Sequence, residues 1–209
     1  MECTQNNQET IILPPTQKVI ETNAFRGQYN LKSIVIPDSV EEIGEDAFME
    51  TGVEEIIFPR ELRKLGIMNG FYPSLRKLDF SKVTKLEVFP SCFLSIDMPE
   101  LKELALPYGV KKIGEAIGGN AICRLFFPPT VEEVGALYQS DTDIYCFSPG
   151  IKSLLPIVED FEPDASCRLL VLPAYVAAYR SQRDAEGISE KTLIIDVIPE
   201  EYRHYTIDS

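Results

Sequence analysis

The amino-acid sequence predicts a β-rich α/β solenoid with a parallel sheet on one face, turns and short helices on the other, and a C-terminal cap. The first observation is a phrase that returns along the chain: LKSIVIPDSVEEIGEDAF at 31–48 reappears in altered form at 53–66, 101–117 and 122–138. The second is a row of regularly spaced prolines, in which Ser81 stands where one further proline is expected. The row consists of Pro14, Pro37, Pro59, Pro107, Pro128, Pro149, Pro173 and Pro199. Self-similarity of this kind indicates one stacked array, in which each unit buries its apolar face against its neighbours.

Each repeat is expected to form one strand, a turn, and a return to the core. The steps between proline markers run from 21 to 26 residues, within the range of leucine-rich repeats. In the unit at 31–48, Ile34 and Ile36 have the period-two spacing of a strand whose inward side chains fill the core. Pro37 has no N–H to donate, so the strand ladder is expected to end there. Gly44 lies at the following bend, where tolerance of positive φ is useful. The side chains expected to return to the core are Val40, Ile43, Ala47 and Phe48.

The C-terminal part changes character. Residues 174–186 lack Gly and Pro and predict a short helix that ends near Gly187, and residues 191–199 predict a further strand. Because a terminal repeat must hide an apolar end, 174–199 predicts a C-terminal cap. The expected organisation is a disordered segment at 1–9, a single solenoid domain at 10–199 that includes this cap, and a tail at 200–209. The exact repeat boundaries stay open in 75–95 and 142–165.

Composition narrows the classes of partner. The chain has 209 residues, of which 44% are hydrophobic, so it can bury a core. Its formal charge is −13, with no run of Lys and Arg, and such a surface repels phosphate backbones and anionic lipid. We therefore expect no nucleic-acid partner, and no membrane insertion because no stretch approaches about 20 apolar residues.

The compartment has two interpretations. The polar first ten residues show no signal peptide, which fits a cytoplasmic protein beginning at Met1 or a secreted one whose leader is outside this sequence. Cys3 and the polar residues that follow it are similar to the start of a mature bacterial lipoprotein, although the cysteine is third rather than first.

The inventory of reactive residues argues against an enzyme. The five cysteines are Cys3, Cys92, Cys123, Cys146 and Cys167; they form no CxxC pair and predict buried thiols. The only histidine is His204, and no nucleophile, phosphate-loop or zinc motif is present, so we expect no catalytic residues, no cofactor and no structural metal. The acidic loop 159–164, with Asp141 and Asp143 nearby in sequence, could supply oxygen ligands to calcium, but it lacks EF-hand spacing and is also consistent with a solvated loop.

The repeat phrase L-x-x-I-x-I-P-x-x-V-x-x-I-G-x-x-A-F resembles the BspA-type leucine-rich repeat of bacterial surface proteins, and the resemblance covers roughly residues 10–199. It is carried by Leu31, Ile34, Ile36, Pro37, Val40, Ile43, Gly44, Ala47 and Phe48. The resemblance implies a leucine-rich repeat solenoid, usually extracytoplasmic or on the cell surface, that is associated with adhesion and with binding of host or partner proteins. It carries over no catalytic position.

The outward positions of the strands form the predicted partner site. If Ile34 and Ile36 point inward, Ser33 and Val35 point outward, and the same alternation makes the exposed column more apolar toward the C-terminal end. The predicted partner-binding residues are Arg124, Phe126, Ile144, Leu169 and Val171. Aromatic and Arg side chains contribute much of the affinity at interfaces, although the cap or the loop at 150–166 could instead cover this surface.

The function hypothesis is a non-enzymatic interaction module that binds a protein or peptide through its repeat sheet. The alternatives are a structural spacer in a cell-envelope assembly and a glycan-binding or glycan-processing protein. The sequence leaves the oligomeric state open.

Overall fold

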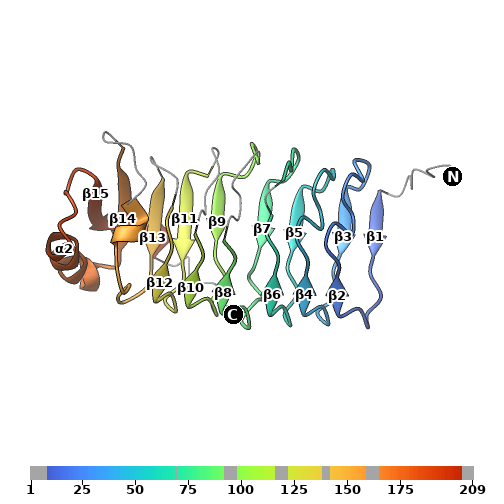
Figure 1. Cartoon of the computed structure of the whole chain (residues 1–209), viewed down its shortest axis with the longest axis horizontal. Helices are drawn as coiled ribbons and strands as arrows, with labels where there is room; N and C mark the ends of the chain where they lie inside the picture. Colours follow the sequence, from blue (N-terminus) through green and yellow to red (C-terminus); the bar gives the residue numbers. More distant parts are fainter. Residues whose placement is uncertain are drawn as a thin grey trace.

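The computed structural model of the chain describes residues 9–68, 70–91, 98–115, 122–137, 142–158 and 165–203. Two rows of short parallel strands face each other along its length (Figure 1). The chain alternates between the rows, so each turn of the solenoid pairs with the next turn. The expected solenoid is confirmed.

One row, which we call the long-strand face, holds most of the longer strands. Its members pair in the ladders β1-β3, β5-β7 and β9-β11-β13-β14-β15. Their bounds are β1 (Thr10–Ile12), β3 (Ser33–Val35), β5 (Glu55–Ile57), β7 (Lys77–Asp79), β9 (Glu103–Ala105), β11 (Arg124–Phe127), β13 (Asp143–Cys146), β14 (Cys167–Val171) and β15 (Leu193–Val197).

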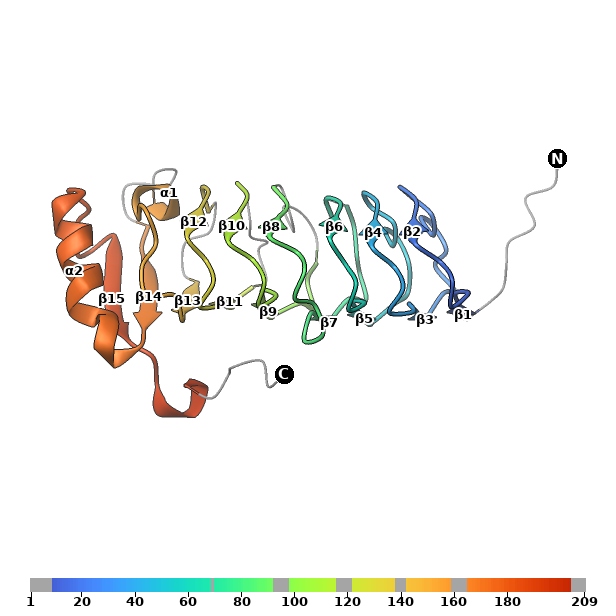
Figure 2. The ribbon, with the colours of Figure 1, turned by 90° about the horizontal axis from the view of Figure 1, so that it is seen from below.

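The opposite row, the short-strand face, is built from two-residue strands and turns, and the four-residue helix α1 (Leu155–Val158) lies at its C-terminal end (Figure 2). Its ladders are β2-β4-β6 and β8-β10-β12. Their bounds are β2 (Val19–Ile20), β4 (Glu42–Ile43), β6 (Lys64–Leu65), β8 (Val88–Phe89), β10 (Lys112–Ile113) and β12 (Glu133–Val134).

The core lies between the two rows. Ile56 of the long-strand face and Ile43 of the short-strand face are both buried. The aromatic side chain that ends the repeat phrase packs between consecutive turns: the rings of Phe25 and Phe48 stack with centroids 5.7 Å apart. Six of the marker prolines begin a turn in which the proline carbonyl accepts a hydrogen bond from the third residue after it, as between the Val40 N–H and Pro37 O at 3.1 Å. They are Pro14, Pro37, Pro59, Pro107, Pro128 and Pro199.

The repeated glycine has a different role from the one expected. Among the described glycines, positive φ occurs at Gly27 and Gly187 and not at the bend of the repeat. A Cβ at Gly44 would lie 2.4 Å from the Thr22 backbone nitrogen, and one at Gly66 would lie 2.4 Å from that of Glu45. Glycine is therefore required because consecutive turns approach closely, which also lets the Gly44 N–H donate to Ile20 O at 2.7 Å.

The C-terminal elements close the stack. A 3₁₀ turn η1 (Pro173–Tyr175) leads into α2 (Val176–Ala185), which ends before Gly187 and lies against β15 at the end of the molecule (Figure 2). The helix and strand expected at 174–186 and 191–199 are thus present. A second 3₁₀ turn, η2 (Glu200–Tyr202), stands where the sequence predicts a plain tail.

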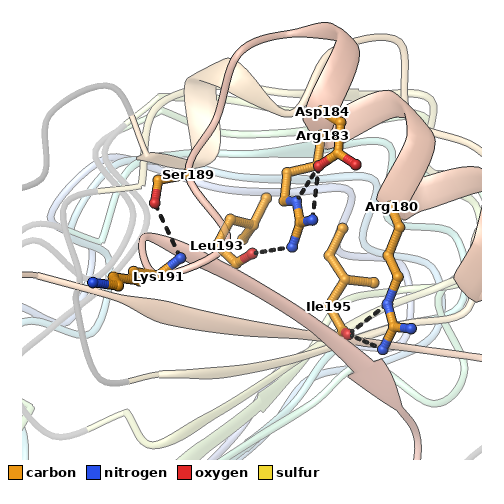
Figure 3. Close-up of polar contacts among 7 residues, drawn as sticks. All are labelled: Arg180, Arg183, Asp184, Ser189, Lys191, Leu193 and Ile195. Carbon is orange, nitrogen blue, oxygen red and sulfur yellow. Dashed lines mark hydrogen bonds and ion pairs between the residues drawn. The ribbon is translucent and has the colours of Figure 1, made fainter.

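Two arginines of α2 protect the last strand. Arg180 donates from Nε and Nη2 to Ile195 O at 3.3 and 3.0 Å, and Arg183 donates from Nη1 to Leu193 O at 3.5 Å (Figure 3). These carbonyls belong to the final strand of the ladder β9-β11-β13-β14-β15. Because an open strand edge is a template for further pairing, the two guanidinium groups end the array.

Candidate functional site

The outer surface of the long-strand face carries two columns of side chains, each with one residue per strand from β1 to β14, and β15 continues them with Ile194 and Asp196. The strand register aligns Lys77 with Glu55 and Arg124 with Glu103 in the first column, and Ile57 with Asp79 in the second. The first column contains Thr10, Ser33, Glu55, Lys77, Glu103, Arg124, Asp143 and Arg168. The second contains Ile12, Val35, Ile57, Asp79, Ala105, Phe126, Tyr145 and Leu170.

The first column neutralises its own charge across neighbouring turns. Lys77 Nζ lies 2.5 Å from Glu55 Oε1, Arg124 pairs with Glu103, and Arg168 lies 3.5 Å from Asp143. The hydrogen bond to Glu55 raises the pKa of Lys77. Exposed pairs of this kind contribute little stability. The column therefore presents little net charge.

The second column has an open N-terminal part. Ile12, Val35 and Ile57 are 73%, 50% and 47% exposed, and they occupy equivalent positions on β1, β3 and β5. We call these three residues the apolar row. Single exposed apolar residues are ordinary on protein surfaces, whereas a contiguous set on one sheet face is typical of an interaction surface.

The C-terminal part of the same column is closed. Phe126 and Tyr145 are 3% and 4% exposed, and their rings stack with centroids 4.6 Å apart. Together with Leu170, Phe147 and Ile198 they form a small apolar cluster separate from the main core. The cluster is covered by Tyr202 of η2, whose ring centroid lies 4.9 Å from that of Tyr145. Burial raises the pKa of Tyr145.

Figure 2 shows the covering segment, which leaves the end of β15 and lies outside the long-strand face near β14. The covering residue Tyr202 lies in the segment 200–209 that the sequence predicts as a tail, just beyond the predicted cap at 174–199, whose residue Ile198 belongs to the cluster. The loop at 150–166 includes residues outside the described part of the chain.

The predicted binding residues divide into two groups. Arg124 and Phe126 point outward as predicted, and Phe126 is then covered. The outward orientation predicted for Ile144, Leu169 and Val171 is wrong: all three belong to the main core and are at most 1% exposed.

The error is a register offset of one residue, which exchanges the two faces of a strand. Arg124 pairs with Asp143 rather than Ile144, and Asp143 pairs with Arg168 rather than Leu169. The distance between the strand and the following proline differs between these two repeats. Phe127 directly precedes Pro128, whereas its register partner Cys146 lies three residues before Pro149. The opposite charges of Asp143 and Arg168, which pair across the two strands, indicate which residues of β13 and β14 face outward.

The structure does not test the calcium hypothesis. Residues 159–164 and Asp141 lie outside the described residues, as does His204. Asp143 forms an ion pair with Arg168. Within the described ranges, no group of three or more His, Cys, Asp or Glu side chains could hold a metal ion.

A groove of about 440 Å³ runs along the C-terminal end of the short-strand face, between Ser91 and Pro156. Glu115 and Glu133 both line it, and the Glu133 carboxylate lies 2.5 Å from Lys152 Nζ and 3.6 Å from Lys112 Nζ. The hydrogen bond from Lys152 lowers the pKa of Glu133. Glycoside hydrolysis needs an acid with a raised pKa beside a second carboxylate. Glu133 therefore does not fit the role of the acid.

Two of the thiols are buried in the C-terminal part of the stack. Burial raises the pKa of Cys146 to about 11 and that of Cys167 to about 12. Because the thiolate is the reactive form, these two cysteines are structural rather than nucleophilic. Cys123 is exposed, and Cys3 and Cys92 lie outside the described residues.

Parallel strands that stack one turn on the next at this repeat length define a leucine-rich repeat solenoid, a fold that is typically non-enzymatic. The model of the BspA type leucine rich repeat region matches residues 2–120 as six copies. The chain belongs to this family.

One solved structure supports the fold. A leucine-rich repeat protein from Bacteroides ovatus is 22% identical with a TM-score of 0.53, over 76% of this chain and 42% of its own. This chain thus spans less than half of that protein. A leucine rich cell surface protein from Faecalibacterium prausnitzii is 16% identical (TM-score 0.28; 61% of this chain, 55% of that one). The pneumococcal vaccine antigen PcpA is also 16% identical (TM-score 0.33; 91% and 68%).

No curated protein matches the sequence. In the part of the chain that the structure describes, no helix is both long enough and apolar enough to cross a bilayer.

Proposed function

We propose that this chain is a non-enzymatic protein-binding module that docks a partner protein on the apolar row of its long-strand face. The observation that carries the proposal is the exposure of Ile12, Val35 and Ile57 at 73%, 50% and 47% on adjacent turns. Burying such side chains against a partner is favourable by a free energy of about 25 cal/mol for each Å² of apolar surface removed from water.

The partner that fits this surface presents an apolar stripe and carries net positive charge. Lys77 of the charged first column pairs with Glu55 of the same column and with Asp79 of the second column, so the surface beside the row favours neither sign strongly. The whole chain has a formal charge of −13, which speeds encounter with a cationic partner and slows encounter with an anionic one. Family membership supports a role in adhesion or partner binding at the cell surface.

The test compares two variants with the same substitution on opposite faces. Ile57→Asp places a charge in the apolar row, and Val88→Asp places one at an equally exposed site on the short-strand face, where Val88 is 55% exposed. Proteins retained by the wild type would be identified, purified and titrated against all three forms. We expect Ile57→Asp to weaken the affinity more than tenfold, a loss of about 1.4 kcal/mol or more, because a charge must then be desolvated at the interface.

Val88→Asp is expected to bind the same partner with unchanged affinity. For the wild type, raising the salt concentration should lower the rate of association with a cationic partner. Equal binding by the wild type and Ile57→Asp would remove the apolar row as the docking surface. Equal weakening by both variants would indicate a general effect of added charge instead.

A further inference from the structure

The C-terminal part of the long-strand face contains a second apolar and aromatic surface, which a later segment of the same chain covers. We call Arg124, Phe126, Tyr145 and Leu170 the aromatic patch, and Pro199–Arg203 the strap. The patch continues the outward columns of the sheet, and the strap seats a single aromatic side chain, Tyr202, on it.

Among the described residues, the strap contacts the patch through the side chain of Tyr202. Its hydrogen bonds stay local: Tyr202 N–H donates to Pro199 O, Arg203 N–H to Glu200 O, and Arg203 Nε to Ile198 O. Among the described residues, the Tyr202 ring centroid lies 6.2 Å from that of Phe126, 4.9 Å from that of Tyr145 and 6.0 Å from the Arg124 guanidinium carbon. The strap is therefore held as a short peptide ligand would be held.

The rest of the cap does not depend on the strap. β15 pairs with β14 at five consecutive positions, and the arginines Arg180 and Arg183 bond α2 to β15. The Ile198 N–H donates to Val171 O at 2.9 Å, so the ordered ladder continues up to the residue before the strap. Release of Tyr202 from the patch thus requires no break in the sheet.

Arg124 shows what further contact an occupant could make. Its Nη2 pairs with Glu103, whereas its Nε is buried with no hydrogen-bond partner among the described residues. A buried donor without an acceptor is costly, and an occupant with a carbonyl or carboxylate oxygen beside its ring would satisfy it. A cation over a ring face is also favourable, so the patch selects an aromatic side chain rather than an aliphatic one.

We propose that the aromatic patch is a second docking surface, which binds an aromatic side chain presented on a turn of a partner protein, and that Tyr202 competes for it in cis. The proposal does not depend on the apolar row of β1, β3 and β5. Because an internal competitor lowers the apparent affinity of any external ligand, weakening the strap should strengthen binding in trans.

The experiment uses the full chain and a labelled synthetic peptide of the strap with its preceding residue, IPEEYR (residues 198–203). Tyr202→Ala removes the competing ring, and Tyr202→Phe retains it as a matched control. We expect the peptide to bind Tyr202→Ala at least tenfold more tightly than it binds the wild type or Tyr202→Phe. The altered peptide IPEEAR should fail to bind Tyr202→Ala.

Three results would overturn the proposal. The peptide could bind all three proteins equally, IPEEYR and IPEEAR could bind Tyr202→Ala equally, or IPEEYR could fail to bind Tyr202→Ala. A Tyr202→Ala protein that does not fold cooperatively, while Tyr202→Phe does, would show that the strap is an integral part of the fold, and the proposal would be abandoned.

Discussion

Ile43→Asp is expected to lower the free energy of unfolding by about 3 kcal/mol or more. Ile43 is the inward residue of β4, is 2% exposed, and lies between Ile20 and Leu65 of the neighbouring turns. A carboxylate there would be buried with no partner for its charge, and the isoleucine contacts on both sides would be lost. Equilibrium unfolding in urea, followed by circular dichroism, measures the change.

Val88→Asp is the matched control for this variant, because Val88 lies on another two-residue strand of the same face but is 55% exposed. Its midpoint should stay close to that of the wild type. If Ile43→Asp and Val88→Asp unfolded at similar urea concentrations, the assignment of the inward positions would be incorrect.

Ile144→Asp is expected to destabilise the protein as strongly as Ile43→Asp, by about 3 kcal/mol or more. Its side chain is 1% exposed and lies in the row Leu125, Ile144 and Leu169 that crosses the ladder inside the core. A charged residue there has no route to water without separating the strands. A thermal melt would show a decrease of several degrees, at roughly 2–4 °C for each kcal/mol in a protein of this length.

Ile194→Asp provides the comparison on the same sheet. Ile194 lies on β15, is the register partner of Arg168 on β14, and is 38% exposed. That variant should melt close to the wild type. A melting temperature of Ile144→Asp within a degree or two of the wild-type value would restore the outward orientation of Ile144 and refute the pairing of Arg124 with Asp143.

Much of the fold can be predicted from sequence, because the spacing of apolar residues within one repeat determines which side chains that repeat buries, and the same spacing recurs along the chain. Ile43 and Phe48 are buried for the reason that their spacing indicates, and Pro37 ends its strand as expected. The bend glycine was predicted at the correct position but for a different reason. The close approach of Gly44 to Thr22 belongs to two turns at once, and a single repeat does not contain that information.

The candidate site could be predicted only in part. Arg124 and Phe126 face outward, as the alternation indicates, but the markers Pro149 and Pro173 lie farther from their strands than Pro128 does from β11. An offset of one residue was enough to reverse β13 and β14. The complementary charges of Asp143 and Arg168 were a better guide to register than the prolines.

The cover over Phe126 could not be predicted in the same way. Tyr202 reaches Tyr145 from 57 residues later in the chain, outside any repeat, and the segment that carries it has no periodicity to indicate where it packs. As a consequence, the exposed apolar surface lies on β1, β3 and β5 rather than on β11, β13 and β14.

Hydroxyl-radical footprinting of the wild-type protein tests this arrangement most directly. The oxidation rate of each side chain would be measured by mass spectrometry and divided by its rate in the same protein unfolded in denaturant, which removes differences in intrinsic reactivity. We expect Ile12, Val35 and Ile57 to keep a large fraction of their unfolded rates, and Phe126, Tyr145 and Ile144 to be strongly protected. Protection of the apolar row together with rapid oxidation of Phe126 and Tyr145 would contradict the account, because the open and covered halves of the sheet would then be reversed.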